Sequence, residues 1–562
     1  MKVSLGFSIG HDKGCVVIID GEIKVGITQE RISRIKHDAA FDSNLPVLAV
    51  DYCLSYLGLT YDDVDIWVYN KSEGDDVIDE QFESTFGVSS NKLKYIPHHL
   101  AHAYSTFYSS GFEESAVIVA DAMGSTKLKG SRCLEWFGGE WDGGEVYDYA
   151  EGITIYHFEK GKESELFKKW IKYPILNDPS EMTSVGEKYG KGTFQLVYQQ
   201  ETNTWNAGKL MGLASYADLE WVDLHEDDSV LTEDDIFIPS SPFFPEVDYR
   251  SDFYSKSNVA GLYQRSQERN SLHLAKIAKK ITGSKNICVS GGSFLNCNTN
   301  EMILKSSMYE GNYFIPCADD SGIPLGCAWW GYKKLDSEFI PSSKLLSPYL
   351  GKKYSFEEID LAIQNFLDET RSREILDVRY YPRKEDQIKS LALKIADNMV
   401  VGFFQGGSEI GPRALGNRSI LASPRKKWVK DYINHEIKMR EWYRPFAPSV
   451  LYENQSEVFD LDVFSPYMLV TARVKEEWKD KIPSVVHVDG TSRYQSVTPE
   501  FNQDYYSLIK FFYEASGIPL VLNTSFNGPD EPIVETPQEA LRTFWRRNLK
   551  SLYIGNYIIT RR

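Results

Sequence analysis

Three of the ten histidines in this 562-residue chain fall within five positions, in the segment His98-His99-Leu100-Ala101-His102. If the segment is helical, His98 and His102 are four residues apart and share a face, so both imidazoles can reach one cation. His99 points elsewhere and is expected to be structural. Because an isolated pair of this spacing is more often packing than a metal site, the interpretation requires further ligands.

Two carboxylates at predicted strand ends are candidates for those ligands. Asp121 ends the apolar run VIVAD, and Asp320 follows a predicted strand in IPCADDSGIPLG. Charge at a buried strand end is costly unless a cation or hydrogen bonds satisfy it. Two imidazoles and two carboxylates make a mixed nitrogen and oxygen site suited to iron, zinc or manganese, with open positions for phosphate oxygens. Asp319 competes with Asp320 for the fourth position.

A second group of chemically useful residues lies in the C-terminal half. Residues 401–450 contain nine Lys or Arg and four Asp or Glu, a local charge of +5 in a chain of net charge -18. Gly, Pro and aromatic residues interleave these cations and indicate ordered turns rather than a solvated basic face. Guanidinium groups suit bidentate contacts to phosphate or carboxylate. The candidates are Arg413, Arg418, Lys438, Arg440, Arg444 and Arg493, with Asn523, Ser525 and Asn527 of LNTSFN after a predicted strand.

The candidate metal ligands need strands and turns that bring them together. VSLGFSIG, CVVIID and EIKVGITQE are separated by turns, and the Asp20-Gly21 dipeptide predicts a hairpin. Helices are expected near residues 46–58 and around His98–Tyr108, and SAVIVADAMGS opens a second hairpin. A third glycine-rich turn follows a strand in NICVSGGSFLN. These turns, in this order, favour a duplicated, actin-like α/β fold that binds a nucleotide.

The remainder of the chain predicts a second α/β domain. Residues 336–355 are rich in Pro, Ser and Gly and indicate a linker. After it, helical patterns such as FEEIDLAIQNFLDE alternate with short strands such as VVGFFQ and IPLVLNTSF. We therefore expect two domains, residues 1–345 and 346–562. Residues 218–248 contain eleven acidic residues and no Lys or Arg, which indicates an inserted surface loop or a lid.

Composition excludes several classes of protein. The acidic net charge argues against a general nucleic-acid binder, because phosphate neutralisation needs clustered cations. The seven cysteines include no C-x-x-C pair, which argues against a disulfide framework or a thiolate zinc site. The start MKVSLGFSIGHDKG has no signal-peptide core, and no apolar run reaches the ~18–20 residues of a membrane span. A cytoplasmic protein is expected.

The segments GHDKG, ERISRIKHD, HHLAHA, GKLMGLA, VSGG, GPRALGNRSIL, REWYRPFAPS and LNTSFN together resemble the O-carbamoyltransferases that tailor nodulation factors, cephamycins, ansamycins and aminoglycosides. The similarity runs nearly end to end. It implies an N-terminal, actin-like, metal-dependent module fused to a C-terminal twisted α/β module that forms adenylates. It also implies two steps. The C-terminal domain makes carbamoyl-adenylate from carbamoyl phosphate and ATP, and the N-terminal domain transfers carbamoyl to an acceptor hydroxyl, releasing AMP.

The resemblance also implies residue roles by motif. His98, His102, Asp121 and Asp320 would hold the divalent metal, with iron favoured over manganese and zinc, and Mg²⁺ would accompany ATP. The residues implied to contact the adenylate are Lys209, Gly291, Gly292 and Asn296. The residues implied to bind carbamoyl phosphate and the ATP phosphates are the nine C-terminal candidates above.

The acceptor hydroxyl needs a general base. His11 and Asp12 in the first turn are the candidates, with Lys36 of ERISRIKHD as a charge stabiliser. The chain departs from the family pattern here, because HDKG replaces the usual HDA-A/S and places Lys13 beside the base. It departs again in SFNGPDEPIV, which lacks the glycine before Glu531.

Two other functions compete with carbamoyl transfer to a hydroxyl. Threonylcarbamoyl transfer to tRNA is disfavoured by the fusion order, the REWYRPFAPS motif and the acidic charge. A non-catalytic nucleotide-binding regulator would be favoured if the metal ligands were missing, and all four are present. The acceptor stays open between a small molecule or sugar and a hydroxymethylated DNA base such as 5-hydroxymethylcytosine, for which Lys127, Lys129 and Arg132 suggest a basic track. No membrane partner is expected, and a homodimer is expected only because such dimers are common.

Overall fold

The computed structural model describes residues 1–10, 12–38, 45–70, 77–121, 126–127, 148–173, 207–225, 252–340 and 344–562. The chain divides into two compact units. Unit 1 comprises Met1–Lys24 and Ala40–Leu346, and unit 2 comprises Val25–Ala39 and Ser347–Arg562. Among the described helices, none has both the length and the apolar character needed to cross a bilayer.

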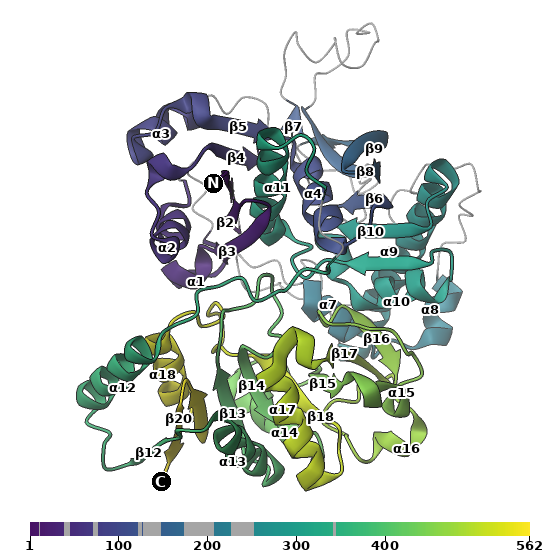
Figure 1. The fold of residues 1–562 in the computed structure, drawn as a ribbon. Coiled ribbons are helices and arrows are strands. Elements are labelled where there is room, and N and C mark those ends of the chain that lie inside the picture. The colour runs from purple at the N-terminus through teal and green to yellow at the C-terminus, as the bar shows by residue number, and fades with distance from the viewer. Residues whose placement is uncertain are drawn as a thin grey trace, which may run out of the picture. The chain divides into compact units, whose positions relative to one another are not determined.

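The first sheet of unit 1 has the order β3-β2-β1-β4-β5 (Figure 1). β1 pairs antiparallel with β2 and parallel with β4, which pairs parallel with β5. The predicted turn joins β2 to β3, and both of its residues have positive φ, 50° at Asp20 and 79° at Gly21, as a two-residue hairpin requires. The strands are β1 (Val3–Ser8), β2 (Gly14–Ile19), β3 (Glu22–Thr28), β4 (Ile66–Asn70) and β5 (Leu93–Ile96).

The second sheet of unit 1 repeats this arrangement. β6 pairs antiparallel with β8 and parallel with β10, β10 pairs parallel with β11, and β8 pairs antiparallel with β9. Strands β9-β8-β6-β10-β11 therefore occupy the places of β3-β2-β1-β4-β5, so the predicted duplication is visible in the strand order. The strands are β6 (Glu114–Ala120), β7 (Thr126–Lys127), β8 (Asp148–Glu159), β9 (Lys162–Tyr173), β10 (Asn286–Ser290) and β11 (Gly311–Phe314).

Two buried helices join the sheets of unit 1. α4 packs on β6 and β10, α11 packs on β1 and β4, and the two helices pack on each other (Figure 1). A Cβ at Gly326 would lie 1.8 Å from the carbonyl oxygen of Ala101, so this close approach requires glycine. The helices of the unit are α2 (Val47–Leu57), α3 (Val77–Phe86), α4 (His98–Ser110), α7 (Ala207–Ala214), α8 (Leu219–His225), α9 (Phe253–Thr282), α10 (Cys297–Lys305) and α11 (Ile323–Leu335).

Unit 2 is built on one mixed sheet of order β12-β20-β19-β13-β14-β18-β15-β17-β16 in the described part of the chain. Helix α13 packs on α17, and α12 packs on α18 (Figure 1). The strands are β12 (Leu376–Tyr380), β13 (Val401–Phe404), β14 (Arg418–Ala422), β15 (Ala447–Leu451), β16 (Val470–Arg473), β17 (Thr491–Val497), β18 (Leu520–Ser525), β19 (Ser551–Ile554) and β20 (Tyr557–Arg561).

The helices of unit 2 begin at clear sequence signals. A capping box at Ser355 and Glu358 starts α12, and Thr536 with Glu539 does the same for α18. The predicted helices after the linker are confirmed as α12 and α13. The helices are α1 (Glu30–Ser33), α12 (Phe356–Thr370), α13 (Lys384–Ala396), α14 (Trp428–Tyr432), α15 (Gln455–Val458), α16 (Glu476–Lys479), α17 (Pro499–Ser516) and α18 (Pro537–Arg546).

A short N-terminal segment belongs to unit 2, which the sequence did not lead us to expect. The Arg31 guanidinium donates to the carbonyl of Gly411 at 2.7 Å. The Arg34 guanidinium donates to the carbonyls of Pro532 and Ile533 at 2.7 and 2.8 Å. These bonds tie residues 25–39 to the C-terminal part of the chain. Of the acidic segment 218–248, residues 226–248 lie outside the described residues.

Candidate metal centre and anion-binding site

His98, His102, Asp121 and Asp320 lie together in unit 1, with one ligand atom of each within 4.8 Å of all the others. His98 Nε2 is 3.3 Å from Asp121 Oδ2 and 3.4 Å from Asp320 Oδ1. His102 Nε2 is 3.6 Å and 3.4 Å from the same two atoms. The structure thus brings all four predicted ligands to one point. Asp319 instead accepts a hydrogen bond from the Ser321 hydroxyl.

Four elements position these side chains. α4 starts at His98 directly after Pro97, so both histidines lie in its first two turns. Asp121 follows the last residue of the buried strand β6, and Asp320 opens the short helix η6 (Asp320–Gly322). The Glu151 carboxylate of β8 accepts from the backbone N–H of His99 at 3.1 Å and pairs with Lys168 at 2.7 Å, which holds the start of α4 on the second sheet.

The four side chains are electrostatically coupled. Burial lowers the pKa of His98, but the carboxylates of Asp320 and Asp121 outweigh burial and raise that pKa well above its usual value. Burial raises the pKa of Asp121, yet His102 and His98 outweigh it and hold the pKa well below its usual value. His99 differs, because burial lowers its pKa to about 4 and its Nδ1 lies 2.8 Å from the Thr154 hydroxyl. His99 is therefore a structural histidine.

The donor set fits a divalent transition metal. Two ligands placed 2.0–2.2 Å from one ion at a tetrahedral angle lie about 3.4 Å apart, close to the measured nitrogen–oxygen separations of 3.3–3.6 Å. His102 Nδ1 lies 3.1 Å from the Ser290 hydroxyl, which can accept its proton and leave Nε2 to bind an ion. Two imidazoles with two carboxylates suit iron, manganese or zinc.

The glycine turn after β10 adjoins the metal cluster. Gly291 has φ +96°, and a Cβ there would lie 2.2 Å from the carbonyl oxygen of Ala120. The N–H of Gly292 donates to Asp121 Oδ1 at 3.2 Å. Asn296 caps α10 by accepting from Thr299 N–H, and its amide also bonds Gln264. The turn therefore supports Asp121, whereas the Asn296 amide is already occupied by protein groups.

The remaining N-terminal candidates fall in different places. Asp12 is half-buried in the turn between β1 and β2, with φ 54°, and His11 lies outside the described residues, as do Lys129 and Arg132. Lys209 is half-buried on α7. Lys36 belongs to unit 2, in the short helix η1 (Lys36–Asp38), whereas Asp12 belongs to unit 1.

Lys438 is the centre of a buried cation cluster in unit 2. Its ammonium group donates to the Asn527 side-chain oxygen at 2.7 Å, the Ser525 hydroxyl at 3.1 Å and both backbone carbonyls. Burial lowers the pKa of Lys438 well below its usual value, and the charges of Arg440, Arg444 and Lys36 lower it further.

The other cations of this cluster repel one another as well. Burial and the charges of Arg444 and Arg493 lower the pKa of Arg440, whose guanidinium lies 4.7 Å above the Phe446 ring. A π-helical turn, Ile433–Ile437, precedes Lys438, and such turns are frequent at functional sites. Positive charges held together against repulsion favour an anion as their partner.

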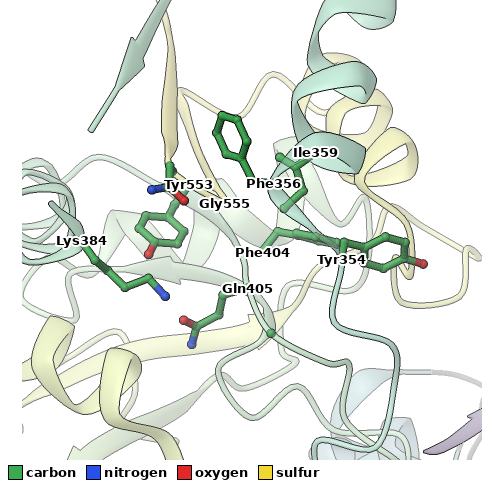
Figure 2. Close-up of a pocket in the computed structure, with 10 residues that line it drawn as sticks. Tyr354, Phe356, Ile359, Lys384, Phe404, Gln405, Tyr553 and Gly555 are labelled. Atoms are coloured by element: carbon green, nitrogen blue, oxygen red, sulfur yellow. The ribbon is translucent and has the colours of Figure 1, made fainter. Parts of the chain in front are cut away.

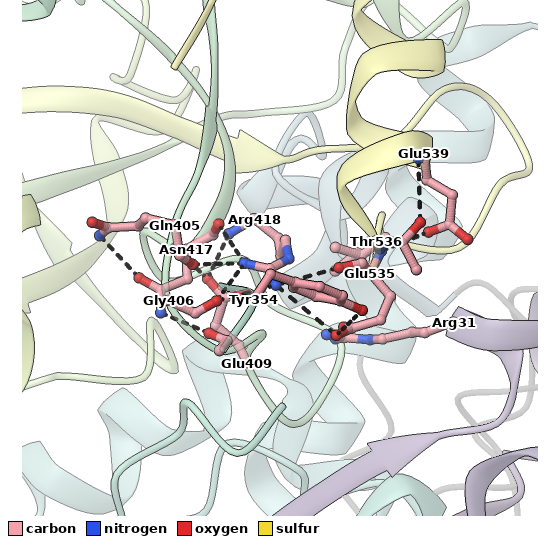
Figure 3. Close-up of polar contacts among 12 residues, drawn as sticks. Arg31, Tyr354, Gln405, Gly406, Glu409, Asn417, Arg418, Glu535, Thr536 and Glu539 are labelled. Carbon is pink, nitrogen blue, oxygen red and sulfur yellow. Dashed lines mark hydrogen bonds and ion pairs between the residues drawn. The ribbon is translucent and has the colours of Figure 1, made fainter. Parts of the chain in front are cut away.

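Arg418 has a different environment from the cation cluster. It is fully buried, and its Nη atoms donate to the carbonyls of Gln405, Gly406, Asn417 and Glu535 (Figure 3). Glu409, also buried, accepts from the N–H groups of Leu415, Asn417 and Arg418 at 2.7–3.2 Å. These contacts favour a structural role for Arg418 in shaping the loop GPRALGN.

The other C-terminal candidates are either buried among protein contacts or partly exposed. The Asn523 amide is buried and donates to the Ala414 carbonyl and the Ser449 hydroxyl at 3.0 and 3.1 Å. Arg413, Arg444 and Arg493 are half-buried, and Arg444 Nη1 lies 3.9 Å from Glu441 Oε2. Sequence reasoning missed Glu409, although its place in the turn GSEIGP marks it as a loop-organising carboxylate.

A small pocket of about 160 Å³ lies in unit 2 where strands β13 and β19 end (Figure 2). The rings of Tyr354, Phe356, Phe404 and Tyr553 line it beside Gln405. Its rings and amide suit a flat ligand with a polar edge. None of the predicted site residues lines this pocket, although the Gly-Gly turn after VGFFQ indicates a place where a ligand can approach the backbone.

Both the N-terminal and the C-terminal part of the chain match models of known protein families. A family model described as Carbamoyltransferase N-terminus matches residues 3–90 and 85–329, and one described as Carbamoyltransferase C-terminus matches residues 392–561. Nodulation protein NolNO of Sinorhizobium fredii (strain NBRC 101917 / NGR234) is 31% identical, over 98% of this chain and 79% of that protein. Nodulation protein U of Rhizobium tropici is 26% identical, over 93% and 90%.

Among solved structures, full-length HypF in the phosphate- and nucleotide-bound form is 13% identical, over 60% of this chain and 56% of that one, with a TM-score of 0.33. The ROK hexokinase from Thermus thermophilus is 10% identical, over 59% of this chain and 100% of that one, with a TM-score of 0.32. Likenesses of this degree carry no information on substrate.

Proposed function

Since the chain belongs to the carbamoyltransferase family and is a carbamoyltransferase, we propose that it makes carbamoyl-adenylate in unit 2 and transfers the carbamoyl group to a hydroxyl in unit 1. The balanced steps are as follows. Water and carbamoyl phosphate give carbamate and phosphate, and carbamate attacks the α-phosphorus of ATP and displaces pyrophosphate. The acceptor hydroxyl then attacks the carbamoyl carbon, its proton passes to a base, and AMP leaves.

The first step needs stabilisation of negative charge more than a nucleophilic side chain. The cation cluster of Lys438, Arg440, Arg444 and Arg493 supplies that charge, with Lys36 as a further member. Ser525 and Asn527 orient Lys438 through the bonds to its ammonium group. Mg²⁺ bound to ATP would neutralise the remaining phosphate charge. The gathering of these cations around the buried Lys438 is the single observation that carries the proposal, because an anion would offset their charge.

The second step would use the metal cluster of unit 1. His98, His102, Asp121 and Asp320 would hold the ion, which supplies Lewis-acid polarisation of the adenylate when bound. Gly291 and Gly292 let the backbone approach the ligand closely. Lys209 remains a proposed adenylate contact. Asp12 and His11 remain the proposed bases for the acceptor proton.

The acceptor is a small hydroxyl compound in this proposal. The resemblance to carbamoyltransferases that tailor nodulation factors, cephamycins and aminoglycosides favours a sugar or a similar small molecule over a macromolecule. A hydroxymethylated DNA base stays the minority alternative, because the net charge of -18 opposes nucleic acid.

The proposal is tested by incubating the purified chain with ATP, ¹³C-carbamoyl phosphate and a panel of sugars, aminoglycosides and 5-hydroxymethylcytosine DNA. We expect AMP and pyrophosphate in solution and a labelled carbamoyl group on one acceptor class by mass spectrometry. Lys438→Met should lose pyrophosphate release, whereas Lys426→Met, a substitution of an exposed lysine outside the cluster, should keep it. Carbamoylation of an acceptor without consumption of ATP would refute the adenylate step.

A further inference from the structure

Strand β12 forms one edge of the unit 2 sheet. Within the described residues its only strand partner is β20, and the sheet ends there. Figure 1 shows β12 at the outer side of β20. An unpaired edge offers backbone donors and acceptors to another strand unless charges or covering elements prevent it.

The direction of the backbone groups on β12 follows from its bonds to β20. The N–H of Tyr381 donates to the Asn556 carbonyl, and the N–H of Arg562 donates to the Ile375 carbonyl. Odd-numbered residues therefore point their backbone groups at β20, and the intervening residues point theirs outward. The N–H and C=O of Val378, the N–H of Tyr380 and the C=O of Leu376 face away from the sheet. The N–H of Leu376 is used locally, by the Ser372 carbonyl.

The sequence of this strand is complementary to itself in antiparallel register. In Leu-Asp-Val-Arg-Tyr, a two-fold axis through Val378 places Asp377 opposite Arg379 of the second copy, and Leu376 opposite Tyr380. Val378 then forms a hydrogen-bonded pair with its own copy. The two charge pairs occupy non-hydrogen-bonded positions, where side chains on facing strands are closest. Arg379 is two-thirds exposed, and its Nε lies 2.7 Å from Asp377 Oδ2 of the same strand.

Two large apolar side chains near the edge are exposed. Tyr380 is 51% exposed and Ile375 is 52% exposed. The Tyr380 ring lies 6.0 Å from the Phe356 ring of α12 and 5.4 Å from that of Tyr557. Large apolar side chains beside an open edge are unusual where the edge is meant to remain unpaired.

We propose that β12 is a dimerisation strand, to which a second copy of this chain adds its own β12 antiparallel about Val378. The partner is another copy because the charge pattern and the outward backbone groups match under two-fold symmetry, which a chance partner would not provide. The contact consists of two Val378 hydrogen bonds, two from Tyr380 N–H to Leu376 C=O, and two Asp377–Arg379 ion pairs. A contact of this size predicts a concentration-dependent monomer–dimer equilibrium.

The first test is analytical ultracentrifugation of the full chain across a concentration series. Val378→Pro removes an outward N–H but no bond to β20, so the fold tolerates it at an edge. We expect the dimer to weaken about 10-fold or more, because both copies lose a hydrogen bond. Arg383→Gln, an exposed residue beyond the strand, is the matched control and should leave the equilibrium unchanged.

The second test uses charge reversal. Asp377→Arg and Arg379→Asp, each alone, place like charges opposite each other and should give monomers. The double substitution restores opposite charges both within the strand and across the two-fold axis, and should restore the dimer. A monomeric wild type at all concentrations, or a dimer unaffected by Val378→Pro and by both single reversals, would overturn the proposal. Unchanged circular dichroism of the variants checks that each folds.

Discussion

His98, His99 and His102 show how neighbouring histidines on one helix acquire different roles. His102 faces two carboxylates, whereas His99 faces Thr154 and is neutral because burial lowers its pKa to about 4. The sequence spacing of four predicted the pair that shares a face. Spacing alone could not show that carboxylates from β6 and η6 would reach the same point.

Replacing His102 tests the metal cluster directly. His102→Gln should weaken divalent metal binding by more than the ~10–100-fold typical of losing an outer-shell partner, since a ligand itself is lost. His99→Gln is the matched control, because it keeps a side chain that can bond Thr154 and should retain the metal. Competition with a chelator, followed by metal analysis, gives both affinities. Equal losses in the two variants would show that the helix, not the ligand, had been disturbed.

The environment of Lys438 predicts that the protein takes up protons when an anion binds. Its pKa is lowered by burial and by Arg440, Arg444 and Lys36, so the free protein holds less than a full proton there at alkaline pH. A bound phosphate raises that pKa, so binding takes up protons, to a limit of one at this site. Calorimetry of phosphate binding above neutral pH, in two buffers of different ionisation enthalpy, measures the uptake. Lys438→Arg should bind with little or no uptake from this position, because arginine stays charged.

Counting cations in the sequence predicted more anion-binding residues than the contacts in the structure support. Arg413 and Arg418 flank the same turn and were indistinguishable as residues, yet Arg418 is fully buried and its Nη atoms bond backbone carbonyls. Whether a cation faces a ligand or the protein depends on tertiary contacts with residues far away in sequence, such as Glu535. Lys36 was expected to act together with the first turn, which lies in unit 1, but it belongs to unit 2.

At the scale of elements, the glycine turn after β10 is the feature on which the metal cluster depends most. Gly291→Ala places a Cβ 2.2 Å from the Ala120 carbonyl oxygen and forces alanine to φ +96°. Backbone strain of about 1–3 kcal/mol adds to that steric overlap, so we expect a loss of more than ~3 kcal/mol of unfolding free energy together with weaker metal binding.

The control for that prediction is Gly58→Ala at the end of α2. Gly58 has φ +67° with open space around it, so only the backbone term of about 1 kcal/mol should appear. Denaturant unfolding of both variants measures the difference. Equal destabilisation would mean that the close approach of β10 to β6 is unimportant.

Most elements followed from local patterns in the sequence. The Asp20-Gly21 turn, the strand before Asp121 and the capped helix α12 were all predictable, because hairpin turns, apolar runs and capping boxes are local. The repeat of strand order became visible only in the pairing of β6, β8 and β10, since pairing is not local. The attachment of residues 25–39 to unit 2 depends on Arg31 and Arg34 reaching distant carbonyls, which no local pattern contains.

At the scale of the whole molecule, we assign one half-reaction to each unit. Unit 2 holds the cations that suit carbamoyl phosphate and ATP, and unit 1 holds the ligands that suit a metal. A substitution in one unit should therefore stop the step carried out by that unit and leave the other unit able to perform its step.

The most direct test measures pyrophosphate release and acceptor carbamoylation in the same reaction for the wild type, His102→Gln and Lys438→Met. We predict that His102→Gln still releases pyrophosphate from ATP and carbamoyl phosphate but forms little carbamoylated product. Lys438→Met should lose both. Carbamoylated product formed by Lys438→Met at the wild-type rate, or no pyrophosphate from the wild type, would contradict the assignment of one step to each unit.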